Sequence, residues 1–284
     1  MGKSASASAI CILVALLATL VVIPGCGGGA YTNSSAGPAG MGDTPPPVSA
    51  TNHWGTSFEA SEGYQVGNID GQQGWTIDGW NPRPDNGAIT ISTDQAATGS
   101  QALKLDYWTS TDDTWWMNLL TASSPSVVPN IPVNSVTVRF KIYRTPGETE
   151  WPVGSGTMHP NIWFNEFCYG VSPIRYLDFG DMFEDMKIHA SLQNSTPRIA
   201  DDPGWDQVAG RFVDLVIYDN FLLGTRIVWY DGHKVATVPI ANPDKLFTNI
   251  SFTYQAVNPG VPANLGKPTY IDDVDVNWEP AVVQ

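Results

Sequence analysis

Apolar and polar residues alternate with a period of two in segment after segment of this chain, which limits its fold more than any other sequence feature. Residues 136–143 carry apolar side chains at every second position, and residues 102–107 place Leu103 and Leu105 on one face and Lys104 on the other. Successive side chains of a β-strand point to opposite faces, so the pattern predicts strands with one buried face. Such strands are typical of antiparallel sheets.

The dipeptide Asp231-Gly232 separates two such segments, residues 227–230 and 233–238. Both central positions of a two-residue hairpin turn need positive φ, so the dipeptide predicts a hairpin. Many short strands with turn signals between them, and no regular strand–helix alternation, predict an all-β sandwich or barrel. Residues 181–189 are the one stretch whose spacing also suits a helix.

The first 25 residues are organised like an export signal. Lys3 precedes an apolar run, residues 9–23, which is too short for a comfortable membrane span and continues into Pro24-Gly25-Cys26. The sequence from Ile23 to Cys26 resembles the lipobox of bacterial lipoproteins, in which the cysteine is lipidated and becomes the first mature residue. The resemblance implies a signal peptide of residues 1–25, a lipid anchor on Cys26 and an outer-membrane or cell-surface location. The alternative is an ordinary signal peptide whose cleavage site contains a cysteine.

Residues 26–52 are rich in Gly, Ser, Ala and Pro and include Pro45-Pro46-Pro47. Such a segment buries too little apolar surface to offset the entropy of ordering, so we expect a disordered tether. Residues 53–284 remain as a single domain long enough to build one sizeable core.

Charge and cysteine usage exclude several partners and crosslinks. The chain has 14 Lys and Arg against 28 Asp and Glu, for a net charge of −14, which makes nucleic acid an unsuitable partner. Of the three cysteines, Cys11 lies in the signal and Cys26 at the anchor. Cys168 is then alone in the domain, so no intramolecular disulfide is expected, and its strand-like surroundings favour a small buried side chain.

Motifs at both ends of the domain resemble those of concanavalin-A-like and laminin-G-like jelly rolls found in bacterial surface proteins. The matching segments are Phe58-Glu59, residues 67–75, residues 98–103 and residues 270–274. The opening Phe-Glu and the closing Ile-Asp-Asp-Val are also similar to family 4 and family 22 carbohydrate-binding modules. The resemblance implies an antiparallel jelly-roll β-sandwich, and the length of the domain favours the larger, concanavalin-A-like form.

The same resemblance implies a structural calcium site. Alternation puts Asp272 on the face of the apolar residues within 274–278, at the edge of the core, and a buried carboxylate needs a partner. In related jelly rolls the acidic residue of the opening Phe-Glu and an Asp of the last strand meet around calcium, which prefers oxygen ligands. The implied ligands are Glu59 and Asp272, with Asp273 as a substitute and the carbonyl of Gly99. The alternative is that Asp272 caps backbone amides or pairs with an arginine.

A candidate sugar-binding face lies in residues 159–166. Alternation places four side chains of this segment on one face, where an indole could stack on a pyranose while amide and imidazole groups hydrogen-bond its hydroxyls. Two neighbouring tryptophans in a loop or strand end could extend the platform. The alternative is that these polar residues are only the solvent-exposed side of a sheet, without a ligand. The candidate residues are His159, Asn161, Trp163, Asn165, Trp115 and Trp116.

An enzymatic function is the main alternative to glycan binding. The chain lacks the Glu-x-Asp-x-x-Glu motif that family 16 glycoside hydrolases carry on this kind of fold. Jelly-roll polysaccharide lyases use a Tyr or His base with a group that neutralises the substrate carboxylate, and His159, Arg175, Tyr176 and His189 match these residue types without a recognised spacing. Three hypotheses stay open: a carbohydrate-binding surface lipoprotein, a lyase or glycosidase, and a structural or adhesion protein without a glycan ligand.

Overall fold

The structure is a computed structural model that describes residues 43–48, 51–79, 89–106, 119–128, 131–146, 162–168, 171–178, 189–192, 210–239, 247–255 and 268–281. All of these residues belong to one compact unit, Gly37–Gln284. No helix within these ranges is long and apolar enough to cross a membrane.

The described residues form β-strands joined by turns and two short 3-10 helices. The helices are η1 (Ala60–Glu62) and η2 (Gln72–Gly74). The strands are β1 (His53–Thr56), β2 (Gly67–Asn68), β3 (Thr76–Gly79), β4 (Ile89–Ser92), β5 (Ala102–Leu105), β6 (Leu119–Ser123), β7 (Val133–Arg144), β8 (Ile162–Cys168), β9 (Val171–Asp178), β10 (His189–Leu192), β11 (Phe212–Asn220), β12 (Thr225–Tyr230), β13 (His233–Pro239), β14 (Phe247–Gln255) and β15 (Thr269–Pro280).

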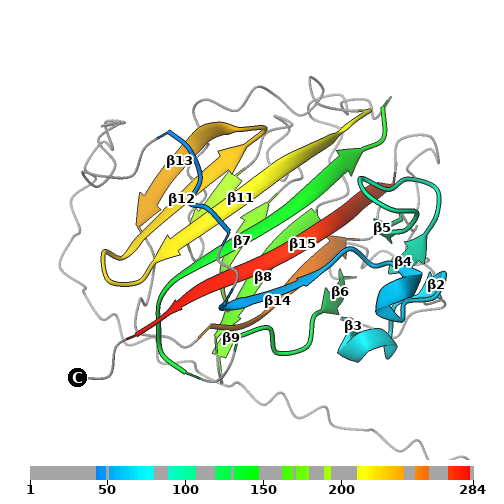
Figure 1. The fold of residues 1–284 in the computed structure, drawn as a ribbon, viewed down its shortest axis with the longest axis horizontal. Helices are drawn as coiled ribbons and strands as arrows, with labels where there is room; N and C mark the ends of the chain where they lie inside the picture. The colour runs from blue at the N-terminus through cyan, green and yellow to red at the C-terminus, as the bar shows by residue number, and fades with distance from the viewer. Residues whose placement is uncertain are drawn as a thin grey trace, which may run out of the picture. The chain divides into compact units, whose positions relative to one another are not determined.

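The strands build two antiparallel sheets. The larger sheet has nine strands in the order β13-β12-β11-β7-β15-β5-β4-β2, and β1 pairs with β15 outside this path. The smaller sheet has six strands in the order β10-β9-β8-β14-β6-β3. Figure 1 shows β8 and β9 passing behind β7 and β15, so the sheets form two layers. The expected all-β, antiparallel jelly-roll sandwich is confirmed.

Apolar side chains from both sheets meet in one core. In β7 the expected alternation holds, because Val138, Phe140 and Ile142 are at most 1% exposed. The ring of Phe140 lies 5.3 Å from that of Phe252 on the smaller sheet, in an edge-to-face arrangement. The ring of Trp75 stacks on that of Phe252, with their centroids 6.4 Å apart. This interdigitation holds the layers together, since each buried aromatic ring removes a large apolar area from water.

The expected hairpin at Asp231-Gly232 is also confirmed. These residues have φ of 50° and 79°, and they connect β12 to β13. The two strands predicted from the alternation, β12 and β13, pair antiparallel on either side of the turn. Their register shifts at a bulge between Val228 and Trp229. The positive φ at both central positions explains why the sequence signal at this turn is so specific.

A β-bulge in β15 overturns one expectation about the last strand. Asp272 pairs with Lys141 and Asp275 pairs with Arg139, so β15 has one more residue than β7 across this interval. Asp273 absorbs the extra residue with φ of 49°. Simple alternation therefore fails here, because a bulge shifts all later side chains by one position. Ile271 shares the core-facing side of β15 with Val274 and Val276. Asp272 therefore lies on the opposite side.

Residues 43–48, which the sequence places in the tether, lie on the larger sheet. The indole Nε1 of Trp229 donates a hydrogen bond of 3.0 Å to the carbonyl of Asp43. Figure 1 shows this short blue segment crossing β12 and β11. It passes close to a second apolar cluster on the side of the sheet opposite the main core, made of Val216, Tyr218, Ile227 and Trp229. We call residues 43–48 the strap.

Candidate functional site

The outer face of the six-stranded sheet contains two rows of residues that run across all six strands. In antiparallel sheets, residues paired directly across strands share a face. Pairing with the buried Phe252 and Ala122 identifies the core side, and the flanking rows therefore lie on the opposite side. The first row is Asp78, Thr121, Thr253, Trp163, Asp178 and His189; the second is Thr76, Ser123, Ser251, Asn165, Tyr176 and Ser191.

The row between these two is apolar and faces the core. Its members are all apolar: Ile77, Ala122, Phe252, Phe164, Leu177 and Ala190. Every position of the outer rows is instead polar or aromatic. Toward the β3 edge Thr76 is exposed and Thr121 and Ser123 are partly exposed, whereas Ser251 in the middle of its row is buried. We call the two outer rows the polar face.

The structure places two of the expected sugar-binding residues on the polar face. Trp163 pairs with Thr253 and Asp178, and Asn165 pairs with Ser251 and Tyr176, so both belong to the side of β8 away from the core. Four other expected residues, His159, Asn161, Trp115 and Trp116, lie outside the described residues.

The lyase candidates are divided between the two faces of the same sheet. Tyr176 and His189 belong to the polar face. Arg175 pairs with Glu166, which pairs with the buried Ile250, so its position is on the core side. His159 lies outside the described residues. The register thus separates the expected base from the expected charge-neutralising arginine.

Asp178 is a candidate residue that the sequence did not indicate. It ends β9 and lies directly opposite both Trp163 and His189. Its place in the row follows from pairings among β8, β9 and β10. Nothing in the local sequence marks it, because alternation defines the faces of one strand but not its neighbours.

The expected calcium residues hold a loop by hydrogen bonds. Glu59 Oε1 accepts from the backbone N–H groups of Ser100 (2.7 Å) and Gln101 (2.8 Å), and its Oε2 accepts from the Ser100 hydroxyl (3.1 Å). Burial alone would raise the pKa of Glu59, but these donors outweigh it and hold the pKa below its usual value. An added Cβ at Gly99 would lie 2.3 Å from Oε1, so a side chain there would displace the Glu59 carboxylate from its hydrogen bonds.

Asp272 holds the preceding part of the same loop. Its Oδ2 accepts from the N–H groups of Ala97 (2.7 Å) and Thr98 (3.1 Å), and its Oδ1 accepts from the N–H of Asp273 (2.8 Å). The side chain is fully buried. Burial raises the pKa of Asp272 to about 6; the three N–H donors oppose this shift and the neighbouring Asp273 adds to it. Asp273 in turn accepts from the Thr98 hydroxyl (2.6 Å) and lies 3.3 Å from Lys141 Nζ.

This arrangement matches the alternative in which Asp272 caps backbone amides. The described residues contain no group of three or more His, Cys, Asp or Glu side chains that could hold a metal ion. An ionised carboxylate offers about four lone-pair sites. The described bonds engage three on Glu59 and three on Asp272.

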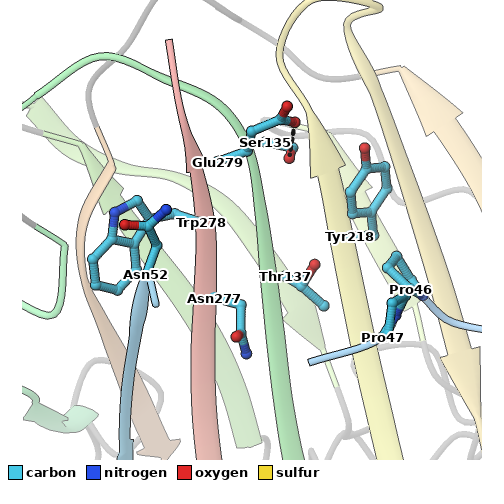
Figure 2. A pocket seen from close by; sticks show the side chains of 9 residues that line it. All are labelled: Pro46, Pro47, Asn52, Ser135, Thr137, Tyr218, Asn277, Trp278 and Glu279. Carbon is cyan, nitrogen blue, oxygen red and sulfur yellow. Dashed lines mark hydrogen bonds between the residues drawn. The ribbon is translucent and has the colours of Figure 1, made fainter. Parts of the chain in front are cut away.

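A cavity of about 330 Å³ lies on the outer face of the nine-stranded sheet, next to the strap. Figure 2 shows Asn277, Thr137 and Tyr218 on three neighbouring strands, with Pro46 and Pro47 beside Tyr218. At the other end, Asn52, Trp278, Ser135 and Glu279 complete the lining. Sequence patterns do not predict this site, because its residues come from separate segments of the chain.

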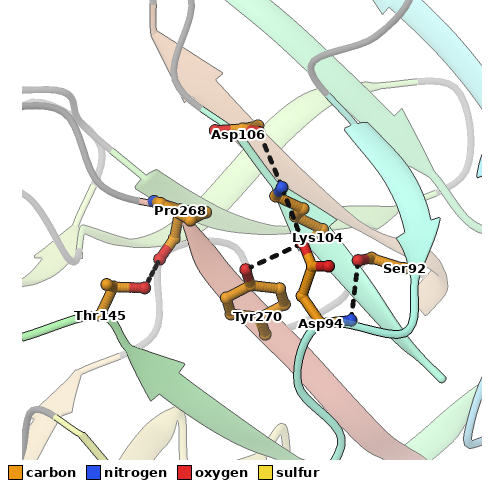
Figure 3. A network of polar contacts seen from close by, with 7 residues as sticks. All are labelled: Ser92, Asp94, Lys104, Asp106, Thr145, Pro268 and Tyr270. Carbon is orange, nitrogen blue, oxygen red and sulfur yellow. Dashed lines mark hydrogen bonds and ion pairs between the residues drawn. The ribbon is translucent and has the colours of Figure 1, made fainter. Parts of the chain in front are cut away.

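A polar network lies elsewhere on the same outer face, around Lys104. Its Nζ lies 3.0 Å from Asp94 and 2.9 Å from Asp106, and the Tyr270 hydroxyl lies 3.5 Å from Asp94 (Figure 3). Burial lowers the pKa of Lys104, but the hydrogen bonds to Asp106 and Asp94 outweigh it and leave a pKa well above the usual value. The same bond from Lys104 lowers the pKa of Asp94. The ammonium is therefore a fixed charge that joins β5 to the loop after β4.

Comparisons with known proteins agree with the fold and leave the family open. No protein-family model matches the chain. No curated protein matches it either. Among solved structures, a sialidase is similar with a TM-score of 0.50 and 10% identity over 80% of this chain; the chain spans only 18% of that protein's length.

Two further similar structures are close to this chain in length. An alginate lyase in complex with an alginate trisaccharide has a TM-score of 0.48 and 9% identity, covering 80% of this chain and 98% of the lyase. A lectin in complex with galactose has a TM-score of 0.46 and 11% identity, covering 81% and 100%. At such identities the likeness concerns the fold alone. The topology of the two sheets defines the class of protein, an antiparallel jelly-roll β-sandwich.

Proposed function

We propose that this protein is an exported, lipid-anchored carbohydrate-binding protein whose polar face contacts glycan. The observation that carries the proposal is the register of the six-stranded sheet, which assembles two complete outer rows of polar and aromatic residues around Trp163. Sugar recognition needs an aromatic surface together with hydrogen-bonding groups that converge on the hydroxyls of the ring. The two rows supply both kinds of group.

The composition of the rows favours a neutral glycan. Among the twelve positions the only ionisable acids or bases apart from Tyr176 are Asp78, Asp178 and His189, and none is Lys or Arg. The whole chain carries a net charge of −14. A uronate polymer would meet this surface with like charge, which disfavours its binding. Hydroxyl and amide groups dominate the second row. Those toward the β3 edge, on Thr76 and Ser123, are exposed or partly exposed and can exchange hydrogen bonds with neutral sugar hydroxyls.

Binding without catalysis accounts for the described positions better than a lyase reaction. A lyase acting on uronate needs a base together with an Arg, Gln or Asn side chain near the substrate carboxylate, and an arginine is the strongest of these because its charge neutralises the carboxylate. Tyr176 and His189 share the polar face, but Arg175 takes a position on the other side of the sheet. Asp178 beside Trp163 leaves a glycosidase as the enzymatic alternative. The other carboxylate of the polar face, Asp78, lies on β3, four strands away from Asp178, which is farther than the pair of carboxylates in such a reaction.

The proposed location follows from the sequence. Cys26 would carry the lipid, and the Gly- and Ser-rich residues after it would separate the domain from the membrane. The polar face would then be presented to glycans outside the cell.

The test is a glycan-array screen of the purified full chain in detergent, followed by titration of the best neutral ligand. Trp163→Ala should weaken binding about fivefold or more, the loss expected for one stacked aromatic ring. Trp163→Phe should restore most of it, and Leu222→Ala, at the exposed tip of the β11–β12 turn, should change nothing. An assay for reducing ends and unsaturated products on the same ligands should stay at background.

Two outcomes would contradict the proposal. If Trp163→Ala folds and binds a confirmed ligand as well as the wild type, the polar face is not the binding surface. If Asp178→Asn or His189→Ala abolishes a cleavage of the ligand while binding persists, the protein is an enzyme.

A further inference from the structure

We propose that the cavity beside the strap is a second binding site, which takes one small polyhydroxylated ring such as a single neutral sugar unit. The cavity lies on the nine-stranded sheet, whereas the polar face belongs to the six-stranded sheet. The cavity uses no residue of the polar face, so binding at each of the two sites can be tested independently of the other.

The floor of the cavity is a row of polar residues that are buried on the outer side of a sheet. Asn277 pairs with Thr137, which pairs with Tyr218, so the three share one face of β15, β7 and β11. Their exposed fractions are 5%, 7% and 8%. Alternation alone would predict solvated side chains here. The Asn277 side chain donates to Asp275, so the hydroxyls of Thr137 and Tyr218 are the groups of this floor that a polar ligand could engage.

Thr137 supplies the sharpest indication. Its side chain is more than nine-tenths buried and lines the cavity, and its hydroxyl has no hydrogen-bond partner among the described residues. The Tyr218 hydroxyl accepts from the Asn220 side chain at 3.1 Å and makes no further bond within the described part of the chain. Ser135 donates to Glu279 at 3.3 Å, a weak bond that a ligand hydroxyl could replace. Two hydroxyls thus remain available to a ligand.

The walls supply the apolar part of the site. Pro46 and Pro47 bring two saturated rings beside the Tyr218 ring (Figure 2), and the Trp229–Asp43 hydrogen bond fixes the strap that carries them. A pyranose has apolar C–H faces and a polar rim. Such a ring would meet the proline and tyrosine rings with its faces and the floor with its hydroxyls.

The volume of the cavity and the charge of its lining limit the class of ligand further. A volume of about 330 Å³ lies at the lower end of the roughly 300–1,000 Å³ typical of small-molecule sites, which suits a ligand of one ring. The lining includes the carboxylate of Glu279 and no Lys or Arg. A neutral ligand therefore fits better than an acidic sugar.

The test is ligand-observed NMR titration of the full chain in detergent with the methyl glycosides of glucose, galactose, mannose and N-acetylglucosamine, and with glucuronate for comparison. At least one neutral glycoside should bind, and glucuronate should not. Thr137→Val keeps the branched shape of the side chain and removes the hydroxyl, and it should weaken binding about five- to tenfold. The matched control is Thr90→Val, on β4 of the same sheet, which should leave the affinity unchanged.

The pattern across variants separates this site from the polar face. Loss in Thr137→Val with retention in Trp163→Ala supports the second site; the reverse pattern overturns it and leaves the polar face as the binding surface. Absence of binding by all four neutral glycosides also overturns it. If Thr137→Val does not fold, as judged by its melting curve, Ser135→Ala and Tyr218→Phe replace it, and unchanged affinity in both would contradict the proposal.

Discussion

Trp229 donates its indole N–H to the backbone carbonyl of Asp43, a bond of 3.0 Å that fixes the strap to the larger sheet. Trp229 is fully buried even though it lies on the side of β12 away from the main core. The strap is therefore a part of the folded domain, although its composition resembles that of the tether.

This contact predicts that the stable domain begins before residue 43. A chain that starts at Thr51 lacks the acceptor for Trp229 and should unfold with a free energy lower by about 1–3 kcal/mol than a chain that starts at Gly42, because a buried donor is left unsatisfied. Chemical denaturation measures the difference, and acrylamide quenching should show greater access to a tryptophan in the shorter chain. Equal stability and equal quenching would mean that the strap does not stabilise the domain.

The raised pKa of Asp272 predicts a specific pH dependence of stability. Its folded-state pKa of about 6 lies above the ordinary value of 3.8, so the folded state binds the proton more tightly. This contribution favours folding below about pH 4 and is lost as the pH rises to about 6, by about 3 kcal/mol for a shift of about two units. Asp272→Asn should remove it.

The measurement is the unfolding free energy of wild type and Asp272→Asn at several pH values from 4 to 7. Carboxyls with lowered pKa values, such as Glu59 and Asp94, act in the opposite direction in both proteins, so only the difference between the two curves is diagnostic. A difference that stays constant with pH would show that Asp272 titrates normally.

Calcium at the loop held by Glu59 and Asp272 remains a proposal, with Asp273 and the Gly99 carbonyl as further ligands. If calcium binds there, adding it to a chelator-treated sample should stabilise the fold by about 2.7 kcal/mol at a hundredfold excess over its dissociation constant. Asp272→Ala should lose this response, and magnesium should give a smaller one. Melting curves that do not change with calcium would leave the loop held by the described hydrogen bonds alone.

Arg226 and Asp219 form a fully buried pair across β11 and β12, with bonds of 2.8 Å and 2.9 Å. Replacing either residue by Ala should cost about 3–5 kcal/mol, because the remaining charge stays buried without its partner. The double variant Arg226→Met, Asp219→Leu should recover most of that loss. A double variant as unstable as the single ones would show that the pair stabilises the domain through more than mutual neutralisation.

The lipid anchor has a direct test in cells. The wild-type protein should incorporate labelled palmitate and partition into detergent, and Cys26→Ser should do neither. Cys168→Ser is the matched control, since its residue lies in β8 and should not affect the labelling. A wild-type protein without label would contradict the anchor.

Local sequence was enough to predict the strands and one turn. The alternation in β7 and the Asp231-Gly232 hairpin depend on side-chain periodicity and on allowed φ values, which are properties of a few neighbouring residues. The same information predicted Trp163 and Asn165 on one side of β8, because alternation defines the faces of a single strand.

Only the tertiary structure decided how those strands combine. The bulge at Asp273 reversed the expected face of Asp272, and the pairing of β8, β9 and β10 placed Asp178 opposite both Trp163 and His189. The floor of the cavity beside the strap also depends on strand pairing, between segments that are distant in the sequence. Strand register and bulges are set by long-range hydrogen bonds and by the packing of the whole sheet, which no short stretch of sequence contains.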